Sequence, residues 1–334
     1  MAGVRATPYP PASRLSTIVR HVAAATSQPR VSGTAASDAE PGAAAAAATA
    51  AQAAPSQRQQ LAPGDDQGYV FRGLCGLAHA MPRAGSMAGH LGAATITGGL
   101  LAAGVEGEID PSSHPLLHDQ LDKIMAGSEI WFNEEQAGVT VPELFVPVPA
   151  GDGQPAQALP IVEALWVNIG KLRQSGHNVI FASIALRALA VYPRLSSRAM
   201  VGGIVELIAS FDGAVAGQGY YSTDTEAPSS DGLGAGRLFG HDAPLSPASE
   251  TVVYTSTDSM VQVTLEELAS TASEHRQGFG GLHHLINHAA ALVVIGELGL
   301  GELAHAGLPA VSQVHTQSRL SSLPLLVMLC VAWA

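Results

Sequence analysis

Apolar side chains recur along much of the chain at the spacing of one face of an α-helix. Apolar residues three or four positions apart predict amphipathic helices. Four stripes of this kind are regular, and two of them begin just after a proline, which the first helical turn tolerates. The stripes are Leu117, Leu121, Ile124 and Met125; Ile161, Leu165, Ile169 and Leu172; Ile180, Ile184 and Leu189; and Val201, Ile204, Ile208 and Phe211.

End signals support these helices and add others. Ser196 or Ser197 is a suitable N-cap for the fourth stripe, because a serine hydroxyl accepts from the free N–H groups of a first turn. Leu265 and Leu268 mark a further helix. Another runs over 282–298 and stops at Gly299, a residue type common at helix ends.

Two remaining windows decide the fold class. The apolar window 89–105 is rich in Gly, Ala and Thr and predicts a packed core helix. Segment 251–255 (TVVYT) has the composition of a strand, but a single strand cannot form a sheet. We therefore predict an all-α fold made of a single multi-helix domain.

The two ends of the chain differ from this domain in composition. Segment 1–37 contains four arginines and no acidic residue, which is typical of an organelle transit peptide for a chloroplast or a mitochondrion. The alternative is an untargeted disordered tail. Segment 38–67, rich in Ala, Gln and Pro, predicts a disordered linker. The helical domain is expected over 68–316, followed by an apolar tail over 317–334.

The apolar run at 323–334 raises the question of a membrane anchor. Twelve residues of helix span about 18 Å, which is shorter than the ~30 Å hydrocarbon core of a bilayer. Membrane association through this tail is therefore not favoured over a buried final helix.

Charge and cysteine content exclude some functions. The net charge is -12 and only 13% of residues are charged, so the clustered Lys and Arg that bind phosphates are lacking. We expect no nucleic-acid partner. The two cysteines, Cys75 and Cys330, make neither a disulfide framework nor a thiolate metal site.

The candidate chemistry lies in histidines that open or occupy apolar helices. His90 and His177 each follow a glycine at the start of such a helix, and His283, His284 and His288 sit together in GLHHLINHAAAL. His284 and His288 are spaced i, i+4 and share a helix face, so they are candidate ligands for a first-row metal such as Fe or Zn. Leu285 stands where a zincin has its catalytic Glu. The alternative is a pair of core histidines satisfied by hydrogen bonds.

Three of these segments resemble, in order, those of the questin-oxidase-like family. They are GHLGAATITGGLLAAG, SGHNVIFASIALRALAVYP and GLHHLINHAAAL. The resemblance implies a helical protein in which His90, His177 and His284 line a pocket. It also implies an activity that inserts oxygen into an aromatic ketone with NADPH. No NADPH-binding motif is present in the sequence.

Three functions from different classes remain open. The first is an organellar oxidoreductase of oxygenase type, acting on a small organic substrate in a His-lined helical pocket, with His90, His177 and His284 as catalytic residues and a metal ion or NADPH as cofactor. Histidine suits general acid–base chemistry near neutral pH. The second is a non-catalytic helical subunit of an organelle assembly. The third is a metal- or tetrapyrrole-binding helical protein without turnover.

Overall fold

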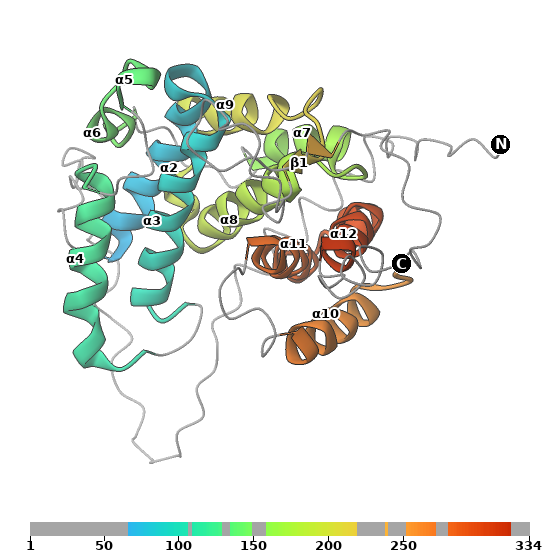
Figure 1. The fold of residues 1–334 in the computed structure, drawn as a ribbon. Helices are drawn as coiled ribbons and strands as arrows, with labels where there is room; N and C mark the ends of the chain where they lie inside the picture. The colour runs from blue at the N-terminus through green and yellow to red at the C-terminus, as the bar shows by residue number, and fades with distance from the viewer. Residues whose placement is uncertain are drawn as a thin grey trace, which may run out of the picture.

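The computed structural model is an all-α fold, as the hydrophobic pattern predicts (Figure 1). The structure describes residues 66–105, 109–128, 134–148, 158–218, 238–239, 252–271 and 280–321. Within them the extended structure is an antiparallel pair of two-residue strands, β1 (Gly217–Gln218) and β2 (Leu238–Phe239).

The first two helices approach each other unusually closely. They are α2 (Asp66–Ala84) and α3 (Gly89–Ala102), joined by the 3₁₀ turn η1 (Ser86–Ala88). A Cβ added to Gly92 would lie 2.7 Å from the carbonyl oxygen of Gly73, and one added to Gly76 would lie 3.0 Å from the Cα of Gly92. Only residues without side chains allow the two backbones to meet here.

Short and amphipathic elements cover the outer side of this helix pair. They are η2 (Pro111–Ser113), α4 (His114–Met125), α5 (Glu134–Ala137) and α6 (Val141–Leu144). From α4, Leu121 is buried against α3, where its side chain meets Gly98. From the α6 region, Leu144 and Phe145 are buried in the main core.

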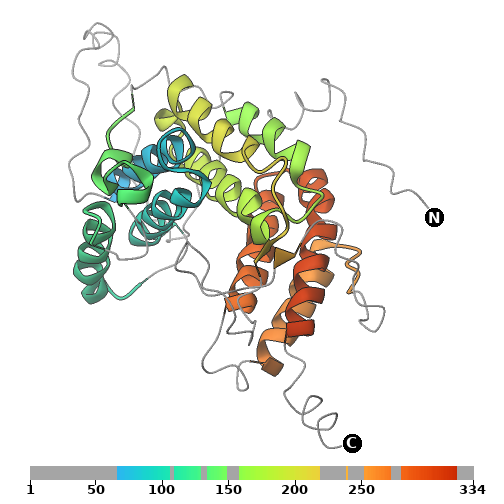
Figure 2. The same cartoon turned by 45° about the horizontal axis from the view of Figure 1, so that its top comes forward.

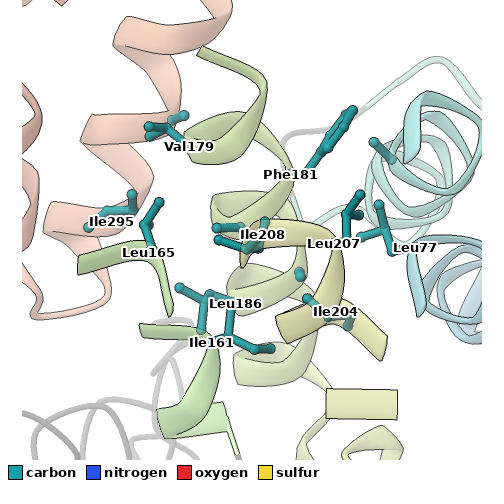
Figure 3. Close-up of a cluster of buried hydrophobic side chains, with 14 of the residues drawn as sticks. Leu77, Ile161, Leu165, Val179, Phe181, Leu186, Ile204, Leu207, Ile208 and Ile295 are labelled. Atoms are coloured by element: carbon teal, nitrogen blue, oxygen red, sulfur yellow. The ribbon is translucent and has the colours of Figure 1, made fainter. Parts of the chain in front are cut away.

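The core lies around the central helix α8 (His177–Val191), which is flanked by α7 (Leu159–Asn168) and α9 (Arg198–Ala209). Figure 3 shows side chains of these three helices meeting, with Leu77 of α2 and Ile295 of α11 at the borders of the cluster. The 3₁₀ turns η4 (Gln174–Gly176) and η5 (Pro193–Leu195) stand at the two ends of α8. The central helix thus contacts α2 and α3, which precede it in the chain, as well as α11, which follows it.

Three C-terminal helices pack on the other side of α8. They are α10 (Thr257–Thr271), α11 (Gly280–Glu297) and α12 (Gly301–Ser321), and both views place α8 between them and the α2–α3 pair (Figure 2). Among the described residues, no helix is both long enough and apolar enough to cross a membrane.

The structure confirms most predicted helices and corrects their details. Ser197 is the N-cap of α9 and accepts from the Met200 N–H at 3.2 Å. Gly299 ends α11 with a φ of 79°. The second stripe is partly wrong, because α7 stops at Asn168 and Ile169 and Leu172 are buried beyond it.

Two long helices were missing from the prediction. In α2 the buried positions include glycines and alanines beside the large residues Val70, Leu74 and Leu77, and both α2 and α12 contain an internal proline, a residue that usually ends or kinks a helix. The strand-like composition of 251–255 was misleading, since the described part of that segment is irregular. The transit-peptide segment, most of the predicted linker and the 323–334 run lie outside the described residues.

Replacing Gly92 with alanine tests the close helix contact. The added methyl group meets backbone atoms of α2, which cannot move independently, so Gly92→Ala should lower the free energy of unfolding by about 1–3 kcal/mol. Gly202→Ala in α9 is the matched control, because no atom lies within 4 Å of its added Cβ; it should raise stability by about 0.5–1 kcal/mol. Urea denaturation measures both, and equal behaviour of the two variants would contradict the close packing.

Candidate functional site: a histidine cluster at two helix starts

His90 and His177 lie at similar places, the first turns of two different helices. Each follows a glycine and a 3₁₀ turn, and each is in the first turn of a long helix, α3 or α8. Each ring folds back so that its Nδ1 bonds the carbonyl oxygen three residues earlier, Met87 at 2.8 Å for His90 and Gln174 for His177. The Nε2 of each ring therefore points away from its own helix.

The two Nε2 atoms face each other 2.8 Å apart. A carbonyl oxygen only accepts, so each Nδ1 must carry a proton to make its backbone hydrogen bond. Two neutral imidazoles hold two protons in total, and both are used in this way. The Nε2–Nε2 contact requires a third proton, or another cation, because otherwise two lone pairs face each other at hydrogen-bonding distance. The geometry is that of a pair that binds one cation.

The helix ends oppose this uptake of positive charge. Both rings stand in first turns, where the unpaired N–H groups give the helix a partial positive charge that disfavours a nearby cation. The Nε2–Nε2 contact requires a proton, whereas the partial positive charge of the two helix starts disfavours binding one. A proton held in such a place can be readily transferred to a basic group of a substrate.

The turn that presents His177 is conformationally strained. Gln174, Ser175 and Gly176 have φ values of 43°, 58° and 93°, a left-handed region that non-glycine residues seldom adopt. Backbone hydrogen bonds to 214–216 hold the turn, from the Gln174 N–H to Val215 at 2.8 Å and from the Ser175 N–H to Ala216 at 2.6 Å. Strain of this kind concentrates at functional sites, where the surrounding structure imposes it.

Aromatic rings complete the surroundings of the pair. The His284 ring of α11 lies 5.1 Å from that of His177 between centroids, so the structure brings His90, His177 and His284 together as a chain. Phe181, one turn into α8, contacts His90 and His177 at 5.3 and 5.4 Å. His177 and His284 are buried and His90 is half-buried, so the cluster runs from the partly exposed His90 to the buried His284.

His288 forms the innermost part of this region. Its side chain is fully buried, and neither ring nitrogen has a hydrogen-bond partner among the described residues. Burial, together with the neighbouring His284, lowers the pKa of His288 to about 3. The ring lies against Gly176, where any side chain would collide with it. His288 is therefore neutral at physiological pH.

The predicted metal site on His284 and His288 has no additional support. Among the described residues, no group of three or more His, Cys, Asp or Glu side chains is arranged to hold a metal ion. Metal-bound histidines commonly donate their second N–H to a backbone carbonyl, and it is His90 and His177 that have this arrangement. Metal ligation by His284 and His288 stays a prediction.

The asparagine next to His177 has a structural role. Asn178 donates to the side-chain oxygen of Asn168 at 2.8 Å, and Asn168 donates to the carboxylate of Asp212 at 2.7 Å. This buried network joins the first turn of α8 to α7 and to the end of α9, and so fixes the position of His177. Asn287, the other asparagine beside the candidate histidines, is exposed.

Comparisons with protein-family models, with curated proteins and with solved structures find no match to this chain. The resemblance to the questin-oxidase-like family stays a prediction. The function must be argued from the histidine cluster itself.

The low pKa of His288 predicts a loss of stability in acid. An unfolded histidine has a pKa of about 6.5. Below that pH the unfolded chain therefore binds a proton at position 288, whereas the folded chain does not bind it until the pH approaches 3. This contribution is present above pH 6.5 and is lost as the pH falls, by about 2–3 kcal/mol at pH 4.5.

Chemical denaturation at several pH values measures this effect. His288→Leu should flatten the dependence of the unfolding free energy on pH. The control His305→Gln changes an exposed histidine of α12 and should leave the dependence as it is. An equally steep loss in His288→Leu and the wild type would show that another group is responsible.

Proposed function

We propose that this protein is an oxidoreductase whose reaction centre is the His90–His177–His284 cluster, with a small organic substrate bound beside it. The observation that carries the proposal is the 2.8 Å contact between two imidazole nitrogens whose other nitrogens are already bound to carbonyl groups. A structural histidine needs no such arrangement, because one neutral ring with two ordinary partners is satisfied.

The chemistry proposed for the pair is general acid–base catalysis. The shared proton can pass from Nε2 to a developing oxyanion of the substrate and return when the product forms. His284, in contact with His177, would orient that ring, and Phe181 would provide an apolar wall. These roles place the proton-donating edge on His90, the half-buried member.

The type of reaction follows from the sequence resemblance. Oxygen insertion into an aromatic ketone produces a negative charge on the ketone oxygen, which a nearby imidazolium would neutralise. NADPH would supply the electrons for this reaction. An organellar location, chloroplast or mitochondrion, is proposed from segment 1–37 alone.

Oxygen uptake in the presence of NADPH and a panel of aromatic ketones tests the proposal, with products identified by mass spectrometry. His177→Gln removes the proton carrier but keeps a polar side chain, and it should lower kcat about 10²–10⁴-fold. The exposed His305→Gln should retain full activity. Unchanged turnover in His177→Gln would exclude the pair as the centre. A wild type without turnover would favour the assembly subunit.

Elemental analysis of protein purified without a histidine tag distinguishes a proton from a metal ion as the cation held between the two Nε2 atoms. The proton-sharing mechanism predicts less than 0.1 first-row metal ion per chain, about the level of contamination, with catalytic turnover intact after chelation. A stoichiometric metal that is lost in His90→Asn would instead assign the Nε2 pair to metal binding.

A further inference from the structure

A second buried histidine connects two ionisable side chains far from it in sequence. His315 of α12 is fully buried, and its Nδ1 is hydrogen-bonded to the hydroxyl group of Tyr254, which precedes α10. Its Nε2 lies 3.2 Å from a carboxylate oxygen of Glu267 in α10, at ion-pair distance. These contacts bridge 61 residues between Tyr254 and His315, and none of the three residues belongs to the cluster described above.

The order hydroxyl, imidazole and carboxylate is that of a nucleophile-activating triad. A triad requires a hydroxyl group that a substrate can reach. Tyr254 is only 7% exposed, and its hydroxyl group is bound to an imidazole with no exposure. The arrangement is therefore better suited to holding the three segments together than to attacking a substrate.

The helix that carries Glu267 has few other buried anchors. Within α10 only Met260 and Thr264 are buried among the described side chains, whereas Leu265 is 58% exposed. Burying one methionine contributes about 1.5–3 kcal/mol, and the His315 contacts add one hydrogen bond, to Tyr254, and one ion-pair contact, to Glu267. The contacts of His315 therefore add to those of Met260 and Thr264 and of the half-buried Val261, Val263 and Leu268 in attaching α10 to the rest of the fold.

We propose that Tyr254, His315 and Glu267 form an acid-sensitive latch that fastens α10, and the chain entering it, to α12. The latch is closed while Glu267 is ionised, because its carboxylate provides the negative charge that faces the buried imidazole. Protonation of this carboxyl group removes that charge, so the packed state no longer favours a protonated His315. In acid the released state, in which water can solvate the protonated imidazole, then becomes more favourable relative to the packed one. Release of α10 uncovers the side of α11 and α12 against which it packs (Figure 1).

Other titratable groups lie on the elements that surround α12. The further carboxylates of α10, Asp258 and Glu266, are exposed, and η4 carries no titratable side chain. Helix α11 carries His283, His284, His288 and Glu297. The charge change at Glu267 must therefore be separated from proton uptake elsewhere, which requires a local readout and a matched carboxylate. The proposal does not depend on the reaction proposed for the histidine cluster.

Hydrogen-exchange mass spectrometry of the full chain provides this local readout. In the wild type, protection of the α10 amides relative to those of α8 should fall about tenfold or more between pH 7 and pH 3.5, across the range in which glutamates titrate. Glu267→Gln should show the reduced protection already at pH 7 and little further loss in acid. Tyr254→Phe should also loosen α10 at pH 7.

Glu266→Gln is the matched control, since it removes the same charge from an exposed neighbouring position and should behave like the wild type. The latch is refuted if relative α10 protection is unchanged by acid in the wild type. It is equally refuted if Glu267→Gln responds to acid as strongly as Glu266→Gln does. Glu266 is exposed and the Glu267 side chain is 11% exposed, and glutamine has nearly the size of glutamate, so loss of the fold is not expected to obscure the comparison.

Discussion

The close approach of helices through residues without side chains is the constraint on which the arrangement of this protein depends. Gly73 and Gly76 of α2 receive Gly92 of α3, and an added Cβ on Gly203 of α9 would meet the backbone of Ala78 in α2. These contacts fix α3 and α9 against α2 at backbone distance. Gly89 then lies directly against the ring of Phe181 in α8, and the first turns of α3 and α8 meet. His90 is placed opposite His177 as a result.

The number of protons that the contacts require differs between the His90–His177 pair, His315 and His288. The contacts of the His90–His177 pair require one proton more than two neutral rings possess, so the pair is built to bind a cation. In the His315 chain, the tyrosine hydroxyl supplies its own proton and the carboxylate supplies the charge. His288 has no partner among the described residues and stays neutral. Only the first arrangement has a proton that it could transfer to another molecule.

Much of the fold could be predicted because large apolar residues recur at helical spacing in α4, α8 and α9. Helix α2 was missed although Val70, Leu74 and Leu77 recur at helical spacing in it. What a hydropathy pattern cannot show is how closely the backbones of α2 and α3 approach through their glycines. The candidate site was partly predictable: His90, His177 and His284 stood out as polar residues at the start of apolar windows. Their convergence depends on tertiary packing.

Other parts of the sites had no local signal in the sequence. The left-handed turn at 174–176 includes two residues, Gln174 and Ser175, whose types do not predict positive φ. The link from Tyr254 to His315 joins positions 61 residues apart. Tyr254 lies in a segment with strand-like composition, and His315 lies in a helix, α12, that the sequence analysis did not predict.

The most direct test of the central claim is nitrogen-15 NMR of the histidine side chains at neutral pH, with assignments from His90→Asn and His177→Gln. The account predicts that both rings are protonated at Nδ1 and that one additional proton is shared between the two Nε2 atoms, so that the signals of both rings change when either is replaced. Two independent, neutral rings, each protonated at Nε2 alone, would contradict it, because the backbone hydrogen bonds that orient the pair could not then exist.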